Sequence, residues 1–148
     1  MTVETYSDKY FLDVVKLVEN FHQEAVGEYD NLLDINVLIQ AIKNQALNNS
    51  KDAFLLIVDG RCQGILFGTR YNSTLNNRVI FQEIIWYVNE PFRRYGVRLL
   101  KEVEKSLKSQ GVSSMIMVYL HNSKSEKLKD FYVRLGYRPM ETHLIRSL

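Results

Sequence analysis

The first third of the chain alternates apolar and polar positions with the spacing of two amphipathic helices. In residues 8–25 and in residues 33–47, apolar side chains recur every three or four positions, which is the repeat of a helix with one buried face. The acidic stretch between them, from Glu24 to Asp34, contains Gly27 and is expected to be a loop. The pattern therefore predicts a pair of helices before any strand.

The middle of the chain changes to short apolar runs separated by turn residues. Residues 53–58 form a continuous apolar run of strand length. Asp59 and Gly60 then supply the two residues that tolerate the positive φ angles of a type I′ hairpin turn. A return strand, a polar turn and a strand rich in β-branched and aromatic residues follow, over residues 62–70, 72–77 and 78–88. These segments predict an antiparallel meander.

Helical spacing returns in the last third of the chain. Apolar positions share one face of a predicted helix over residues 97–110, and Gly111 is suited to end it in the left-handed conformation. A strand over residues 115–120 follows. Because a strand, a helix and a second strand of one sheet connect by a right-handed crossover, strands 78–88 and 115–120 are expected to be parallel.

One more helix is expected near the end of the chain. Ser123 and Glu126 have the spacing of a capping box that opens a helix, and Gly136 is suited to end it. Residues 142–148 are expected to form a final strand. The segments together predict an α+β (mixed α/β) fold, with a central mixed sheet, an antiparallel N-terminal meander, a strand–helix–strand crossover and helices on both faces.

Composition narrows the class of protein. The 148 residues suit a single domain over residues 1–148, and 46% hydrophobic with 24% charged residues is ordinary for a globular protein. The net charge of +2 and the lack of a helix-turn-helix pattern argue against nucleic acid as a partner.

The cysteine and histidine content argues against disulfides and metal. The single cysteine, Cys62, cannot form an internal disulfide, so a reducing, cytoplasmic setting is expected. The first residues lack a signal-peptide pattern and no apolar run has the length of a membrane span, so no membrane partner is expected. The histidines lack the spacing of a zinc site, and no metal is predicted; they are His22, His121 and His143.

The stretch from Pro91 to Gly96, where a strand ends and a helix begins, is the first candidate for chemistry. The first N–H groups of a helix have no partner within it and carry the positive end of its dipole. With Arg93, Arg94 and Arg98 they would hold a diphosphate, and Gly96 would let the backbone approach it without a Cβ. The plainer alternative is a connecting loop with solvated arginines.

Two polar side chains at apolar positions are the second candidate. Tyr132 lies on the apolar face of the last predicted helix, so it is either a core tyrosine or an acid with a pKa near 10 that protonates a leaving group. Glu83 lies within a predicted strand, so it is either an outward-facing or edge residue or a general base for an attacking amine.

The chain resembles the GNAT superfamily of acyl-CoA-dependent N-acyltransferases. The resemblance covers most of the length, because the helix pair, the meander, the loop and helix after Val88 and the next strand follow the family's order. The family ends its last helix with an aromatic residue or Leu, then Tyr, two further residues, Leu-Gly and an aromatic residue. This chain has Phe131-Tyr132 followed by Leu135-Gly136-Tyr137.

The pyrophosphate loop departs from the family pattern Gln/Arg-x-x-Gly-x-Gly/Ala. With Arg93 in the first position, Arg98 replaces the last small residue. With Gly96 in the last position, Pro91 takes the first position and Arg94 replaces the middle glycine. We favour this second register because the family's Leu-Leu pair then falls on residues 99–100.

The resemblance implies acetyl-CoA as the cosubstrate and direct attack by an amine in a ternary complex. It implies that the Val88 N–H stabilises the oxyanion, that Glu83 takes the amine's proton and that Tyr132 protonates the CoA thiolate. Ser125 replaces an asparagine common in such families, and Asn122 lies just before it. The candidate cofactor-binding residues are Trp86, Tyr87, Val88, Arg93, Arg94, Tyr95, Gly96, Val97, Arg98, Asn122 and Ser125.

The resemblance leaves the acceptor amine open, on a small molecule or on a protein. Acidic residues in the predicted loop suggest a cationic acceptor such as a polyamine, lysine or an aminoglycoside, unless the loop is merely solvated; they are Glu24, Glu28, Asp30 and Asp34. The competing interpretation is a catalytically degenerate GNAT-fold binding or structural module, which an arginine in a glycine position would suit. The oligomeric state also stays open, a homodimer included.

Overall fold

The computed structural model describes residues 1–26, 33–120 and 124–148, which form two compact units, Met1–Ile116 and Met117–Leu148. The first unit is a sheet with helices packed on it, and the second contains one helix and the C-terminal segment. The single domain expected over residues 1–148 stays a prediction.

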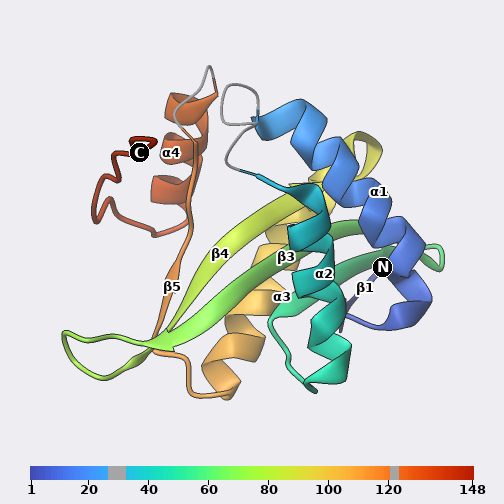
Figure 1. Ribbon diagram of the computed structural model, residues 1–148, viewed down its shortest axis with the longest axis horizontal. Helices are drawn as coiled ribbons and strands as arrows, with labels where there is room; N and C mark the ends of the chain where they lie inside the picture. The colour runs from blue at the N-terminus through green and yellow to red at the C-terminus, as the bar shows by residue number, and fades with distance from the viewer. Residues whose placement is uncertain (27–32, 121–123) are drawn as a thin grey trace. The chain divides into compact units, whose positions relative to one another are not determined.

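The first unit is built on one mixed sheet of five strands (Figure 1). The strands are β1 (Thr2–Thr5), β2 (Ala53–Val58), β3 (Arg61–Asn72), β4 (Val79–Val88) and β5 (Ser114–Ile116). They lie in the order β1-β2-β3-β4-β5, antiparallel from β1 to β4 and parallel between β4 and β5. The predicted α+β fold with a mixed sheet is therefore confirmed.

The edge strand β1 is missing from the sequence-based prediction. Its four residues, Thr-Val-Glu-Thr, include no apolar run, and they form a strand by pairing with β2, where Thr2 lies opposite Ile57. The hairpin between β2 and β3 follows the prediction, because Asp59 and Gly60 have φ angles of 50° and 74°. The turn could thus be predicted from its own residues, whereas β1 could not, because it forms only by pairing with β2.

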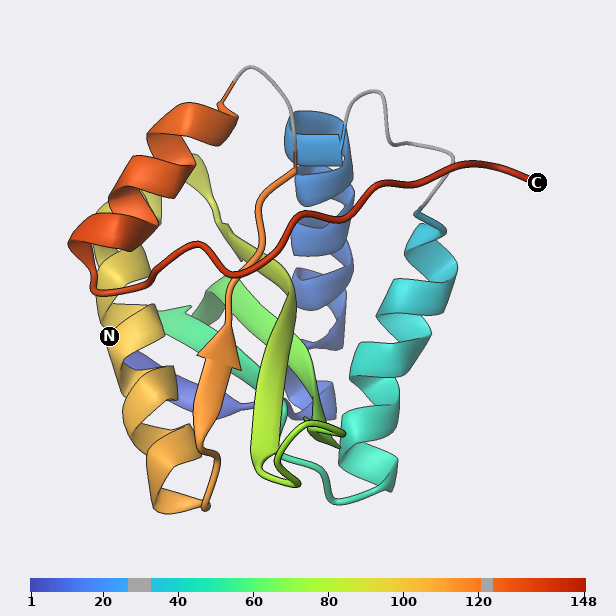
Figure 2. The same cartoon turned by 90° about the vertical axis from the view of Figure 1, so that its left-hand side faces the viewer.

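Helices cover both faces of the sheet. They are the 3₁₀-helix η1 (Asp8–Tyr10), α1 (Phe11–Phe21), the π-helical turn η2 (His22–Val26), α2 (Ile35–Leu47) and α3 (Gly96–Ser109). Figure 2 shows α1 and α2 on one side of the strands and α3 on the other. These helices match the predicted ones, and α2 begins at Asp34, whose carboxylate accepts the Asn36 N–H at 2.9 Å.

Each face of the sheet has its own layer of buried side chains. Leu17 of α1 and Ile42 of α2 pack with Leu55 and Ile65 of the sheet in one cluster. On the other face, α3 buries Leu99, Leu100, Val103 and Leu107, and it contacts β2, β3 and β4. These two layers hold β4 in place between the helices.

The second unit consists of α4 (Ser125–Arg134) and the segment after it. Gly136 has a φ of 95° and follows α4 as predicted. The Tyr132 ring packs against Phe131 and Tyr137, with centroids 6.2 and 5.7 Å apart. The predicted capping box lies partly outside the described residues, because Ser123 is not among them.

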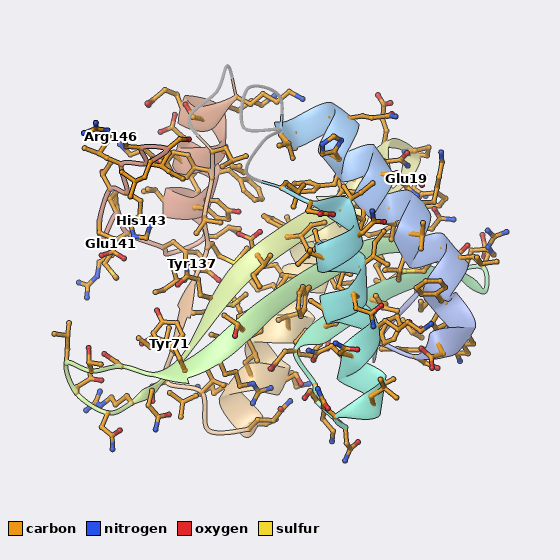
Figure 3. All side chains as sticks on the ribbon, viewed as in Figure 1. Glu19, Tyr71, Tyr137, Glu141, His143 and Arg146 are labelled. Atoms are coloured by element: carbon orange, nitrogen blue, oxygen red, sulfur yellow. The ribbon has the colours of Figure 1, made fainter. Side chains whose placement is uncertain are left out.

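Two predicted strands differ from the structure. The predicted strand over residues 142–148 is wrong, because this segment is exposed and has no ladder partner among the residues described. In it, His143 Nε2 lies 3.0 Å from Glu141 Oε1 (Figure 3). The strand predicted over residues 115–120 is shorter than expected, because the ladder with β4 extends only to Ile116.

Candidate functional site

The ladder between β4 and β5 covers only the first part of β4. Three pairs join the strands, Ile80 with Ser114, Phe81 with Met115 and Gln82 with Ile116. β4 itself continues to Val88. The ladder with β5 forms no pair beyond Gln82 within the described part of the chain, and we call the stretch of β4 that this ladder does not reach the free edge.

The backbone of Val88 faces this edge. The Asn89 N–H donates to the Gln63 carbonyl of β3 at 2.9 Å, and successive N–H groups of an extended strand point to opposite sides. The Val88 N–H and carbonyl therefore point away from β3. Arg93 supports this direction, since its Nε donates to the Val88 carbonyl at 3.5 Å. By the same alternation, Trp86 also presents its N–H and carbonyl at the edge.

A β-bulge lies at the start of this free edge. Phe67 pairs with Ile85 and Gly68 with Glu83, which leaves Ile84 as the extra residue of β4. Glu83 is only 6% exposed, so the alternative of an outward-facing residue is excluded. Because a bulge bends its strand and redirects side chains, it sets the direction of this buried carboxylate.

The predicted phosphate loop is folded as the 3₁₀-helix η4 (Glu90–Tyr95), which runs directly into α3. Asn89 begins it, accepting the Phe92 N–H at 2.8 Å, and the Gly96 N–H donates to the Arg93 carbonyl. The Gly96 N–H therefore has no partner within α3, as expected, but η4 supplies one from outside that helix. A Cβ on Gly96 would have ordinary contacts of 3.7 Å with Trp86, so the fold itself does not require glycine there.

The arginines predicted to act together, Arg93 and Arg94, have different partners in the structure. Arg93 Nη2 contacts the carboxylate of Glu24 in η2, and the Tyr87 hydroxyl donates to the same carboxylate at 2.7 Å. Arg94 instead donates to the Tyr95 hydroxyl at 2.9 Å and lies over its ring. Arg93 thus links the end of the α1 region to the end of β4, whereas Arg94 stays with its own helical turn.

The contact between Arg93 and Glu24 also involves the Tyr87 phenol and affects its pKa. Partial burial raises the pKa of the Tyr87 phenol, and the hydrogen bond to Glu24 raises it further. The phenol therefore stays neutral at physiological pH and acts as the donor to the Glu24 carboxylate.

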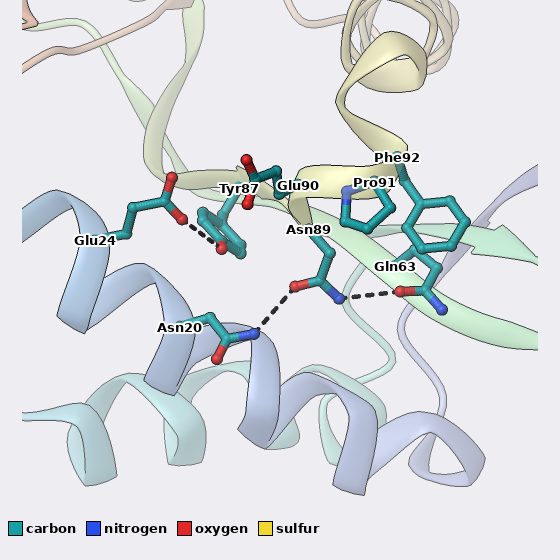
Figure 4. A pocket seen from close by; sticks show the side chains of 8 residues that line it. All are labelled: Asn20, Glu24, Gln63, Tyr87, Asn89, Glu90, Pro91 and Phe92. Atoms are coloured by element: carbon teal, nitrogen blue, oxygen red, sulfur yellow. Dashed lines mark hydrogen bonds between the residues drawn. The ribbon is translucent and has the colours of Figure 1, made fainter.

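A pocket of about 370 Å³ opens beside this link (Figure 4). Asn20 Nδ2 donates to Asn89 Oδ1 at 3.1 Å, and Asn89 Nδ2 donates to Gln63 Oε1 at 3.0 Å, which makes a row of three amides. The pocket is lined by Asn20, Glu24, Gln63, Tyr87, Asn89, Glu90, Pro91 and Phe92. Sequence reasoning missed the three amides, because they come from separate elements and share no local motif.

The remaining predicted residues come from both units. Tyr132, in the second unit, is 6% exposed, and its hydroxyl lies 3.4 Å from the Val118 carbonyl. Ser125 is the first residue of α4, and Val97 and Arg98 are exposed in the first turn of α3. Asn122, Glu28 and Asp30 lie outside the described residues.

Cysteine and metal chemistry gain no support from the geometry. Cys62 is 3% exposed, and burial raises the pKa of its thiol to about 12. In the described ranges, no three His, Cys, Asp or Glu side chains are grouped as metal ligands. No helix in those ranges is both long and apolar enough to span a bilayer.

No protein-family profile and no curated protein sequence matches this chain. Solved structures do resemble it. A possible acetyltransferase from Clostridium difficile 630 has a TM-score of 0.76 at 17% identity, covering 99% of this chain and 96% of its own. A GNAT family acetyltransferase from Staphylococcus aureus has a TM-score of 0.67 at 18% identity, covering 99% and 98%.

A third similar structure is an aminoglycoside acetyltransferase from an uncultured soil metagenomic sample, in complex with sisomicin. Its TM-score is 0.71 at 12% identity, with 99% of this chain and 95% of its own covered. At such identities the likeness concerns the fold, and it extends over nearly the whole of each chain. This chain therefore has the fold of the GNAT superfamily of acetyltransferases.

Proposed function

We propose that this protein transfers an acetyl group from acetyl-CoA to a primary amine by direct attack in a ternary complex, in a cytoplasmic setting. The observation that carries the proposal is the stretch of β4 beyond its ladder with β5, where the Val88 N–H points away from β3. The fold shared with solved acetyltransferases supports it.

The free edge fits the amide-bearing arm of acetyl-CoA. An extended pantetheine chain alternates carbonyl and N–H groups and would pair with β4 as a short strand does. The Val88 N–H would then meet the thioester oxygen, and the arginines of η4 and of the first turn of α3 would hold the diphosphate. Arg93 reaches this region from the Glu24 side, so binding of a diphosphate involves the Arg93–Glu24 pair.

The chemistry requires one base and one acid. An alkyl ammonium with a pKa near 10 must lose a proton before attack, and Glu83 is the proposed base, directly or through water. The amine nitrogen then bonds to the thioester carbon, and the negative oxygen is stabilised by the Val88 N–H. The C–S bond breaks as the tetrahedral intermediate collapses, and the departing thiolate takes a proton from Tyr132. The nitrogen, which is positively charged after the attack, gives up its second proton, and this proton returns through solvent to the Tyr132 phenolate.

Two measurements test the proposal. Calorimetric titration with acetyl-CoA reports binding, and thiol release across a panel of amines reports turnover. Tyr132→Phe is expected to lower kcat by about 10²-fold or more, whereas Tyr137→Phe, a neighbouring tyrosine on the same unit, serves as the matched control. Equal rates for Tyr132→Phe and wild type across pH would remove Tyr132 from the mechanism.

The rival function has a distinct outcome. A degenerate GNAT-fold binding module would bind acetyl-CoA in the titration yet release no thiol with any amine. Absence of acetyl-CoA binding would refute both the enzyme and this module.

A further inference from the structure

The pocket beside η4 has a charge balance that selects its ligand. Of its two carboxylates, Glu24 is paired with Arg93 and accepts the Tyr87 hydroxyl. Glu90 is exposed at the start of η4 and forms no ion pair within the residues described. The two carboxylates and the paired Arg93 guanidinium together carry a net charge of about −1. This net charge attracts a cation and repels an anion.

The amide row makes the wall of this pocket polar and directional. The two hydrogen bonds of the row leave the Gln63 NH₂ group and the Asn20 carbonyl oxygen with no other partner in the described part of the chain. These groups offer both donors and an acceptor, which suits a ligand with hydroxyl or amide groups. An alkyl ligand without such groups would leave them unsatisfied, at a cost in affinity.

The pocket is also next to the proposed reaction site. Tyr87 and Asn89 line it, and Val88 between them carries the N–H that faces the free edge of β4. Adjacent residues of a strand are about 3.3 Å apart, so the pocket lies within one residue of Val88 along the chain.

We propose that this pocket holds the acceptor, and that the acceptor is a hydroxylated diamine. This inference rests on the proposed acetyl transfer and names its substrate class. One amino group stays protonated beside Glu90, with the hydroxyl on the amide row. The other amino group loses a proton to Glu83 and bonds to the thioester carbon. As the C–S bond breaks, the CoA thiolate takes a proton from Tyr132, and the nitrogen gives up its second proton to solvent to become the amide.

Matched small amines test the class. 1,3-Diamino-2-propanol and 1-amino-2-propanol differ by one amino group, and thiol release with acetyl-CoA gives a KM for each. The diamine is expected to have a KM about two- to fivefold lower, the range of a solvent-exposed ion pair. Glu90→Gln should remove this preference, whereas Glu102→Gln, at an exposed site on α3, should keep it.

A second readout does not depend on turnover. In ¹H–¹⁵N NMR spectra, the side-chain NH₂ signals of Asn20, Gln63 and Asn89 are expected to shift with the diamine more than with the monoamine, and less in Glu90→Gln. Turnover with equal preference in wild type and Glu90→Gln overturns the inference while sparing the proposed function. Absent thiol release refutes the proposed function, and the NMR titration still decides whether the pocket binds the diamine: unshifted amide signals overturn the pocket as well.

Discussion

Gly68→Ala tests whether the bulge that positions Glu83 depends on close packing. A Cβ at residue 68 would lie 2.5 Å from Cζ and 2.6 Å from Cε1 of Phe81, and closer still to the Gln82 carbonyl oxygen. Carbon atoms in contact are normally about 3.5–4.0 Å apart, so the methyl group intrudes by about 1 Å. Phe81 is fully buried and Gln82 contributes a backbone atom, so neither can move aside cheaply.

The expected cost of this overpacking is about 2–3 kcal/mol in the free energy of unfolding. A chain of this length loses about 2–4 °C in Tm for each kcal/mol, which gives a drop of about 4–12 °C. Urea and thermal unfolding measure both quantities. The matched control is Gly96→Ala, where the nearest atoms to the new Cβ are 3.7 and 3.8 Å away and φ is −59°, so stability should hold or rise.

A Gly68→Ala protein with a Tm within about 2 °C of wild type would refute the reasoning. It would mean that β3 and β4 separate at the bulge at little cost. Loss of stability in Gly96→Ala equal to that in Gly68→Ala would refute it too, since the effect would then not come from local crowding.

Three further predictions follow from single residues. Gly96→Ala should weaken acetyl-CoA binding by about tenfold in calorimetry, because its Cβ would meet the diphosphate, and unchanged affinity would place the diphosphate elsewhere. The pKa of Asp13 is lowered by its hydrogen bond with Arg61, so its stabilisation is complete above the unfolded pKa near 3.9 and is lost as pH falls through the lower folded value. Asp13→Asn should therefore cost more stability in urea at pH 7 than at pH 2, and an equal cost would contradict this. Cys62 should react with a thiol reagent at pH 8 only after unfolding, because its thiol is buried with a pKa of about 12, and rapid reaction of the native protein would show it accessible.

The parts of the fold that the sequence predicted are those set by local periodicity. The helix pair, α3 and the hairpin at Asp59 and Gly60 follow from apolar spacing and turn chemistry within a few residues. β1 and the end of β5 depend on a partner strand, so their own residues say little about where pairing begins or stops. The predicted strand over residues 142–148 failed for the same reason, since a segment forms no strand without a ladder partner.

The candidate site was predictable only where it follows one strand. The sequence showed an apolar strand at β4, and this strand contains Glu83, Trp86 and Val88. The pocket could not, because Asn20, Gln63 and Asn89 are distant in sequence and meet only in the folded unit. The ion pair between Arg93 and Glu24 could not be predicted either, because the two residues are distant in sequence.

At the end of β4, side chains and backbone groups point in different directions because the chain is extended. Side chains alternate between the two faces of a sheet, whereas backbone N–H groups alternate between its two edges. Tyr87 and Asn89 therefore turn their side chains into the pocket while Val88 between them turns its N–H to the free edge. A shift of the β3–β4 register by one residue would exchange both sets at once. The bulge at Gly68, which fixes this register, therefore governs the proposed acceptor pocket and the proposed acyl site together.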